Sequence, residues 1–186
     1  MKHLILISGP PGAGKSHFAA GLAKRLKAVL LDKDLVDEPF SPNDRGVGYQ
    51  KKIQPRSVAV LLGLARENLN TVGTVILDAP WTRITHQMPF LCHEFKKLAR
   101  QNKARLTVFE CVISEHKLKK RITDRGLVRD KNKLKNNEAW KDFLSTHCFD
   151  QRIKLRHVVM DVEKKHDSLI KKAVRYLTLL EKSSPR

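Results

Sequence analysis

The sequence predicts an α/β fold, namely a three-layer sandwich whose central parallel sheet has about five strands. Short, wholly apolar runs recur along the chain, which is the pattern of strands buried on both faces. Stretches with helical spacing of apolar residues alternate with these runs, and this alternation is typical of a parallel sheet covered by helices. The chain has 186 residues and no repeat or linker that would divide it, so we expect a single domain over residues 1–186.

A glycine-rich stretch follows the first apolar run, Leu4–Ile7, and precedes the first helical pattern. It fits G-x-x-x-x-G-K-[ST] and consists of Gly9, Pro10, Pro11, Gly12, Ala13, Gly14, Lys15 and Ser16. Its last two glycines permit positive φ angles, which turn successive N–H groups toward one point where an anion binds. Lys15 supplies a full positive charge, and the hydroxyl of Ser16 suits Mg²⁺. We therefore expect the residues from Gly9 to His17 to bind the phosphates of a nucleotide.

Carboxylates stand at the ends of the next two apolar runs. Ala28–Leu31 leads into Asp32 and Asp34, and Thr74–Leu77 leads into Asp78. The ligand crevice of an open parallel sheet lies outside the carboxyl ends of its strands, so these side chains are expected beside the glycine-rich loop. Such an acid contacts Mg²⁺ or its water, or binds substrate, or else caps a helix or turn. Asp78 is therefore a candidate Mg²⁺ group, together with the hydroxyl of the loop.

Two segments separate these runs. The stretch Pro39–Gly48 contains two prolines and two glycines, which predicts a loop that closes over substrate. A helix with one apolar face follows from Pro55, and Gly73 ends it. The apolar positions of this helix are Val58, Leu61, Leu62, Ala65 and Leu69.

The third run continues into the crevice as Ala79–Arg83. There, Trp81 would stack on a ring of the substrate and Arg83 would meet an anion. The alternative is packing, because a tryptophan after a strand is more often part of the core. Helical spacing over residues 91–98 then predicts another helix, and Leu106–Ile113 predicts the fourth strand.

Residues 115–146 are predicted to form a lid. Arg121 and Arg125 are four residues apart on one stripe of a helix that spans Glu115–Arg125, and Arg129 extends the spacing by four more. A polar run follows at residues 130–137. Arginines with this spacing are typical of a mobile lid that carries guanidinium groups over transferring phosphates, and the alternative is a solvated basic helix.

The last elements are a short fifth strand at Val158–Met160 and a terminal helix. The helix is marked by Leu169, Ile170, Ala173, Val174, Leu177 and Leu180. The tail from Lys182 to Arg186 is expected to fray.

The net charge is +18 and is unevenly distributed. Residues 1–95 hold 12 Lys and Arg against 8 Asp and Glu, whereas residues 96–186 hold 25 against 11. A cationic second half favours polyanionic partners such as a nucleotide, a phosphorylated metabolite or nucleic acid, and the alternative is a solvated basic face. Because few aromatic side chains accompany this charge, we expect only weak, sequence-indifferent and salt-sensitive nucleic-acid binding.

Cysteine usage and hydropathy narrow the class of protein. Cys92, Cys111 and Cys148 are widely spaced and form no C-x-x-C pattern, which argues against a disulfide framework or a zinc site. No apolar run reaches the length of a membrane span, and the run at Leu4–Ile7 is too short for a secretory segment. A cytoplasmic protein without membrane contact is expected.

The order of strand, glycine-rich loop, helix, two acid-tipped strands and an arginine-bearing lid resembles a small P-loop kinase, over most of the chain. It is similar to the ATP-binding group with polynucleotide 5'-hydroxyl kinases, chloramphenicol phosphotransferase, zeta toxins and gluconate kinase. The resemblance implies a P-loop containing nucleoside triphosphate hydrolase fold, ATP and Mg²⁺ as cofactors, and Lys15 as a catalytic cation. It places Asp34 as the base toward a substrate hydroxyl, with Asp32 as the second candidate. Arg121 and Arg125 match the R-x-x-x-R pattern of the group's lid, and Arg129 is assigned to substrate.

Two departures leave the phosphate acceptor open. Val36, Asp37 and Glu38 stand where polynucleotide kinases carry an arginine, and the second strand does not end in the D-G-D of gluconate kinases. The resemblance thus implies transfer of the γ-phosphate of MgATP to a hydroxyl of a small molecule. The alternatives are a polynucleotide 5'-hydroxyl kinase and a nucleotide-binding regulator or NTPase. A motor ATPase is disfavoured because Ala79, and not a glutamate, follows Asp78.

Overall fold

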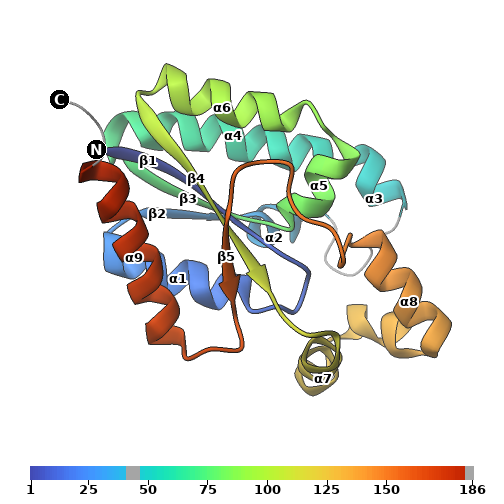
Figure 1. The fold of residues 1–186 in the computed structure, drawn as a ribbon. Coiled ribbons are helices and arrows are strands. Elements are labelled where there is room, and N and C mark those ends of the chain that lie inside the picture. The colour runs from blue at the N-terminus through green and yellow to red at the C-terminus, as the bar shows by residue number, and fades with distance from the viewer. Residues whose placement is uncertain (41–46, 183–186) are drawn as a thin grey trace.

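The computed structural model describes residues 1–40 and 47–182. Within them, five parallel strands form one sheet in the order β2-β3-β1-β4-β5 (Figure 1). The strands are β1 Lys2–Ser8, β2 Val29–Asp32, β3 Thr74–Asp78, β4 Ala104–Val112 and β5 Val158–Asp161. The predicted α/β class and the parallel five-stranded sheet are confirmed.

Helices cover both faces of the sheet. Figure 1 shows α4 and α6 on one face and α1 and α9 on the other. The helices toward the N-terminus are α1 Lys15–Leu26, α2 Lys33–Asp37, α3 Val47–Lys52, α4 Gln54–Thr71 and α5 Trp81–Gln87. The rest are α6 Leu91–Gln101, α7 Glu115–Arg125, the 3₁₀ helix η1 Val128–Leu134, α8 Asn137–Thr146 and α9 His166–Lys182. None of these described helices is long and apolar enough to cross a membrane.

Alternation along β1 divides the core into two parts. Leu4 and Leu6 face the cluster under α4 and α6, whereas Ile5 and Ile7 face the cluster under α1 and α9. All four side chains are fully buried. Burial of each such aliphatic side chain stabilises the fold by about 1.5–3 kcal/mol, so β1 is the central support of both layers.

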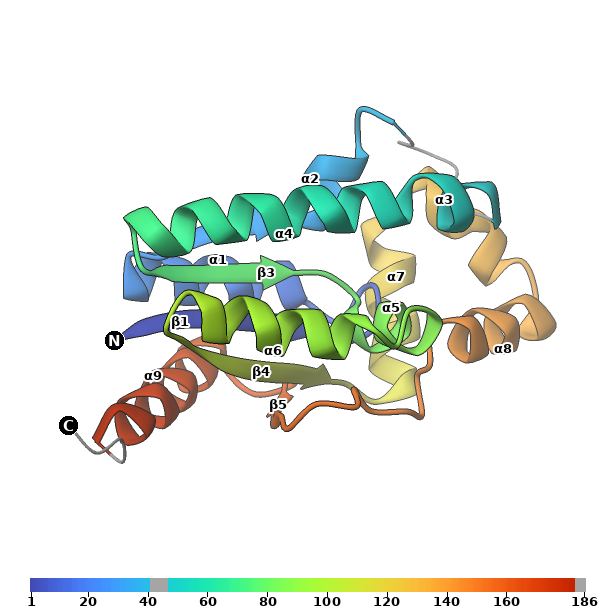
Figure 2. The same cartoon turned by 90° about the horizontal axis from the view of Figure 1, so that it is seen from above.

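Strand register brings the carboxyl ends of the strands to one edge. Asp32 of β2 is paired with Asp78 of β3, and Ser8 at the end of β1 is paired with Glu110 of β4. Figure 2 shows the strand ends pointing toward α5, α7 and α8. The glycine-rich loop leaves β1 at this edge, so it lies beside the acids that end β2 and β3.

The region after β2 differs from the sequence prediction. Asp32 caps α2, because its Oδ1 accepts a hydrogen bond from Asp34 N at 2.8 Å. Lys33 and Asp37, four residues apart, form a buried ion pair at 2.6 Å that Tyr49 of α3 also joins. The predicted loop at Pro39–Gly48 therefore ends earlier than expected, since α3 begins at Val47, and its middle, residues 41–46, lies outside the described residues.

The glycines of the loop make room for neighbouring backbone and side chains. Gly9 has a φ of 135°, and a Cβ at this position would lie 2.5 Å from the carbonyl oxygen of Cys111 in β4. Gly12 has a φ of 87°, and a Cβ there would lie 2.7 Å from Cγ1 of Ile122 in α7. The loop can thus pack against both β4 and α7 only with glycine at these positions.

We predict that Gly9→Ala destabilises the protein by roughly 2 kcal/mol or more, because the contact is with backbone and the φ angle is unfavourable for alanine. Gly63 is the matched control, since it lies exposed within α4 and a Cβ there would meet no neighbouring atom within 4 Å. Gly63→Ala is expected to stabilise by about 0.5–1 kcal/mol through helix propensity. Urea unfolding of both variants measures these changes, and a neutral Gly9→Ala would contradict the described packing.

Candidate active site

The glycine-rich loop forms one wall of a cavity of about 570 Å³ at the carboxyl edge of the sheet. Lys15 is 9% exposed, and its Nζ donates a hydrogen bond to the carbonyl oxygen of Pro10 at 3.1 Å. Gly14 caps α1 with a left-handed backbone and without a side-chain hydrogen bond, so the start of α1 offers its N–H groups to a ligand. The wall therefore combines a lysine charge with a helix N-terminus, which is the arrangement that binds phosphate.

Asp78 is the buried acid of this cavity. Its side chain is 2% exposed, and its Oδ1 is buried without a hydrogen-bond partner. Burial raises the pKa of Asp78 to about 6, although Lys15 and a hydrogen bond with Ser16 lower it and the charges of Asp32 and Asp34 add to the rise. An unsatisfied carboxylate oxygen beside a hydroxyl fits Mg²⁺ or its water.

The residues that line the cavity suit Mg²⁺ better than they suit a metal ion whose ligands all come from the protein. Among the described residues, no group of three or more His, Cys, Asp or Glu side chains is arranged to hold a metal ion. Mg²⁺ usually keeps several waters and takes one or two protein ligands plus substrate phosphates. Ser16 and Asp78 would be those ligands.

The two candidate substrate acids line the same cavity from β2 and α2. Asp32 also caps α2 through its Oδ1, as described above, so its position is tied to the backbone of Asp34. Asp34 is half-buried in the first turn of α2. Both acids therefore line the same cavity as Lys15 and Asp78.

Trp81 and Arg83 both follow β3, but their side chains lie in different surroundings. Trp81 is fully buried, packs edge-on against Phe95 with ring centroids 5.0 Å apart, and donates its indole N–H to Leu77 O at 3.0 Å. The prediction that Trp81 contacts substrate is therefore wrong, because α5 starts at this residue and turns its side chain into the core. Arg83 does line the cavity, is 6% exposed, and donates from Nη2 to Oε1 of Gln54 at 3.0 Å.

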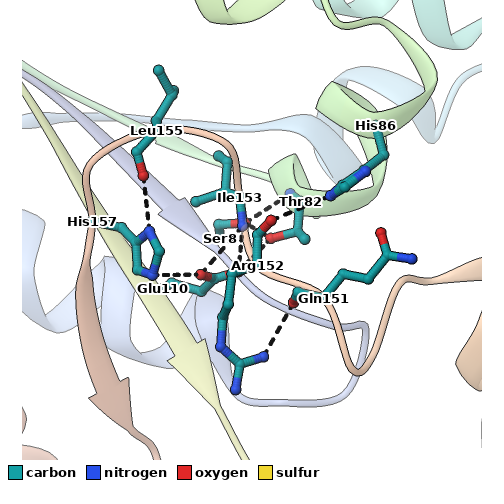
Figure 3. A network of polar contacts seen from close by, with 9 residues as sticks. All are labelled: Ser8, Thr82, His86, Glu110, Gln151, Arg152, Ile153, Leu155 and His157. Carbon is teal, nitrogen blue, oxygen red and sulfur yellow. Dashed lines mark hydrogen bonds and ion pairs between the residues drawn. The ribbon is translucent and has the colours of Figure 1, made fainter.

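A buried polar network fixes the start of α5 (Figure 3). Thr82 Oγ1 lies 2.8 Å from Ser8 Oγ and donates to Oε1 of Glu110 at 2.6 Å. Glu110 also accepts a hydrogen bond from Ile153 N at 3.2 Å and pairs with His157 at 3.3 Å. The network therefore joins the end of β1, the start of α5 and the segment that leads from α8 to β5.

Arg125, the last residue of α7, lines the cavity. Its guanidinium forms a bidentate pair with Asp130, at 2.5 Å from Nε and 2.9 Å from Nη2. Lys133, which also lines the cavity, donates to the same carboxylate at 2.5 Å. Burial raises the pKa of Asp130, but the hydrogen bonds from Arg125 and Lys133 outweigh burial and leave that pKa lowered. Asp130 thus holds two cations at the cavity, a role that spacing alone did not indicate.

Arg121 lies elsewhere than the sequence suggested. Its Nη1 donates to Ala13 O at 2.8 Å and its Nη2 to Val162 O at 3.0 Å. It lines a second cavity, of about 320 Å³, which shares Gly14 and His17 with the first. Its predicted position over the transferring phosphates is corrected accordingly, because α7 crosses the loop and its successive turns face different cavities. The side chain of Arg129 lies outside the described part of the structure.

Two histidines stand beside Arg121 in the second cavity. The rings of His17, from α1, and His166, from α9, have centroids 4.0 Å apart. Phe18 and Leu169 add apolar surface to the same cavity. It therefore combines flat rings, a guanidinium and apolar walls next to the phosphate-binding loop.

His147 is a site residue that sequence reasoning missed. It lines the cavity of about 570 Å³ from the C-terminal end of α8. Its Nδ1 lies 2.9 Å from Phe143 O. Since a carbonyl only accepts, Nδ1 carries the hydrogen and Nε2 is an acceptor. Burial and the charge of Arg83 lower the pKa of His147 to about 3, so the imidazole is neutral.

Solved structures share this fold across nearly the whole chain. A sugar kinase from Janibacter sp. has a TM-score of 0.62 at 14% identity and covers 100% of both chains. A gluconokinase from Sinorhizobium meliloti has a TM-score of 0.60 at 18% identity, with 96% of this chain and 93% of that chain covered. A shikimate kinase from Aquifex aeolicus has a TM-score of 0.58 at 14% identity, with 97% and 99% covered. At these identities the likeness shows the fold.

Sequence comparison adds one match. Residues 4–148, which include the glycine-rich loop, the three acids, α7 and η1, match the AAA domain family AAA_33. No curated protein matches the chain in sequence.

The buried carboxylate of Asp78 predicts a pH dependence of stability in the ligand-free protein. Its pKa is raised from 3.8 to about 6, so its contribution to folding is present below pH 3.8 and is lost as the pH rises through about 6. Asp78→Asn removes this titration. From about pH 4 to about pH 8, the wild type should lose roughly 2–3 kcal/mol more unfolding free energy than the variant. Urea titrations without Mg²⁺ and nucleotide measure this, and parallel pH profiles would contradict it.

Asp130→Asn is expected to lower the free energy of unfolding by roughly 3 kcal/mol at neutral pH, because it leaves two cations without their shared buried carboxylate. Asp142, exposed on α8, is the matched control, and Asp142→Asn should change stability by less than about 0.5 kcal/mol. Urea unfolding compares the two. Equal effects of the two substitutions would remove Asp130 from its assigned role.

Proposed function

We propose that this chain, which belongs to the AAA domain family AAA_33, is a P-loop kinase that transfers the γ-phosphate of MgATP to a hydroxyl of a small molecule. One observation carries the proposal. A single cavity unites the glycine-rich loop, the buried acid Asp78, the acid Asp34 and the lid cations Arg125 and Lys133. Phosphoryl transfer needs these parts, because the protein mainly positions the reactants and offsets negative charge.

The loop wall would bind the donor. Its N–H groups and Lys15 would hold the phosphates of ATP, and Ser16 and Asp78 would hold Mg²⁺. Mg²⁺, when bound, would offset negative charge on the phosphates. Asp78 would contribute its ionised form, and Lys15, whose amine donates to Pro10 O, would contribute its positive charge.

Asp34 would act as the base. It accepts the proton of the acceptor hydroxyl as the oxygen forms its bond to the γ-phosphorus, and the bond from that phosphorus to the bridging oxygen breaks to release ADP. Asp32 is the second candidate. Its capping bond to the backbone of Asp34 favours a structural role for Asp32 and leaves Asp34 as our choice.

The lid and the second cavity complete the proposed site. Residues 115–146 form the lid of a single domain, and Arg125 and Lys133 offset the charge that develops during transfer. Arg121 instead braces the loop through Ala13 O and forms one wall of the second cavity. We assign that cavity to the base of the nucleotide, because the rings of His17 and His166 suit stacking.

A second candidate function is a polynucleotide 5'-hydroxyl kinase. The observation that favours it is the net charge of residues 96–186, with 25 Lys and Arg against 11 Asp and Glu. Trp140 and Phe143 of α8 pack against each other, with ring centroids 5.2 Å apart. Both side chains are buried, so neither is exposed for stacking on a base. We therefore propose only weak, salt-sensitive nucleic-acid binding, and 5'-hydroxyl oligonucleotides enter the test below.

We predict that Asp34→Asn keeps its affinity for MgATP but transfers phosphate about 10²- to 10⁴-fold more slowly, which is the usual effect of losing a general base. An ATP-consumption screen with pooled sugars, nucleosides, hydroxy acids and 5'-hydroxyl oligonucleotides identifies the acceptor, and calorimetry gives the nucleotide affinity. Lys15→Ala is expected to lose both binding and turnover.

Asp32→Asn is the matched control in this experiment. A rate loss confined to Asp32→Asn would reassign the base. ATP hydrolysis that no acceptor stimulates would instead favour the regulator or NTPase alternative over a kinase.

A further inference from the structure

We infer that His147 accepts a hydrogen bond from a second hydroxyl of the phosphate acceptor, in addition to the hydroxyl that is phosphorylated. The acceptor is then a polyhydroxy compound such as a sugar, a sugar acid or a nucleoside. This inference rests on the proposed kinase function and specifies its acceptor. It starts from the imidazole of His147, which lines the same cavity as Asp34 and Lys15.

The backbone of α8 fixes the tautomer of this imidazole. Nδ1 of His147 lies 2.9 Å from Phe143 O, and since a carbonyl oxygen only accepts, the hydrogen of the neutral ring is on Nδ1. Nε2 therefore carries a lone pair, and within the described part of the chain it has no hydrogen-bond partner. A ligand that displaces water from Nε2 must supply a donor there, because the acceptor is otherwise left unsatisfied.

The surroundings of the ring favour a neutral donor. Burial and the charge of Arg83 lower the pKa of His147 to about 3, and the charges of Lys133 and Lys15 add to this lowering. The same environment opposes an ammonium group beside Nε2, whereas a hydroxyl donates without adding a charge. Asp34 is already assigned to the reacting hydroxyl, so the donor at His147 is a further hydroxyl of the same molecule.

Contacts within and beside α8 hold the imidazole in place. The ring of His147 packs on Phe143 with centroids 4.5 Å apart, and Trp140 packs on Phe143 in turn. Trp140 Nε1 donates to Oε1 of Glu115 in α7 at 2.7 Å, and the side chain of Asn136 caps the start of α8. The helix end at which His147 lies is therefore fixed from its N-terminal side.

The segment that follows His147 is tied to the edge of the sheet (Figure 3). Ile153 N donates to Oε1 of Glu110 at 3.2 Å, and Thr82 Oγ1 donates to the same oxygen at 2.6 Å. Thr82 N donates to Oγ of Ser8 at 2.9 Å, and Ser8 directly precedes the glycine-rich loop. The imidazole is thus held from both sides relative to the phosphate-binding loop, which is the preorganisation that a specific hydrogen bond to a substrate needs.

An acceptor held in this way distinguishes a hydroxyl from its absence. A site built to hydrogen-bond a substrate hydroxyl rejects the analogue that lacks it, because the polar group of the site is then left unpaired. The cavity volume of about 570 Å³ lies in the range of small-molecule sites. The inference therefore predicts selection among small acceptors by a hydroxyl that does not react.

Pairs of acceptors test this with the intact protein. Each pair joins a polyhydroxy compound to a twin that lacks one hydroxyl: glucose with its 2-deoxy and 3-deoxy forms, gluconate with its 2-deoxy form, and adenosine with its 2'-deoxy and 3'-deoxy forms. NMR of the product locates the phosphate, so that twins lacking the reacting hydroxyl are set aside. For the best acceptor, we expect one remaining twin to lose at least about tenfold in kcat/KM.

Variants connect that selection to the imidazole. His147→Phe removes the acceptor nitrogen and keeps a flat ring against Phe143. It should lower kcat/KM at least about tenfold for the parent compound and less than about twofold for the twin, which removes the selection. His147→Gln keeps an acceptor oxygen and should keep part of the selection. His93, exposed on α6, is the matched control, and His93→Phe should leave both values unchanged.

The outcomes separate this inference from the proposed function. Equal kcat/KM for the parent and for every twin that keeps the reacting hydroxyl overturns the inference and leaves the kinase proposal standing. An equal loss for both members of the pair in His147→Phe does the same, since a merely structural role lowers both. If no compound is phosphorylated, the kinase proposal fails and the inference fails with it. His147→Leu, which also lacks an acceptor, decides the assignment by the same ratio if His147→Phe does not fold.

Discussion

Parallel pairing of the strands brings the carboxyl ends of β1, β2 and β3 to a single edge of the sheet. The positions of the candidate site residues depend on that edge. The pairing of Asp32 with Asp78 places two carboxylates side by side, and the glycine-rich loop leaves β1 between β3 and β4. The loop can make this turn because Gly9 approaches the backbone of β4 more closely than any other residue could. The geometry of the cavity is thus a consequence of backbone packing in the core.

The charges around the cavity are then oriented one by one. Asp130 orients Arg125 and Lys133, Gln54 orients Arg83, and a backbone carbonyl orients Lys15. Facing these cations is Asp78, whose burial raises its pKa to about 6. Burying such groups costs folding free energy. A polyphosphate with Mg²⁺ would offset that cost, because the phosphates would meet the cations and Mg²⁺ would meet the carboxylate. This arrangement supports a site built to bind a highly charged ligand in a defined orientation.

Local patterns in the sequence predicted the parts that local chemistry determines. The strands, the phosphate-binding loop and the acids at the strand ends follow from apolar runs and glycine positions, and the structure brings them together as expected. Asp130 and His147 could not be found in this way, because their roles depend on how η1 and α8 fold back on the cavity. Arg121 and Arg125 share one helical stripe, yet they face different cavities because α7 crosses the loop. Trp81 was misassigned for a related reason, since a helix that starts at this residue turns its ring inward.

A crystal structure of the protein with Mg²⁺ and a non-hydrolysable ATP analogue tests the central claim most directly. The account predicts the β- and γ-phosphates within the Gly9–Ser16 loop, Mg²⁺ beside Ser16 and Asp78, the base in the second cavity, and the terminal phosphate facing Asp34. A triphosphate bound outside the loop, or a terminal phosphate turned away from Asp34, would contradict it.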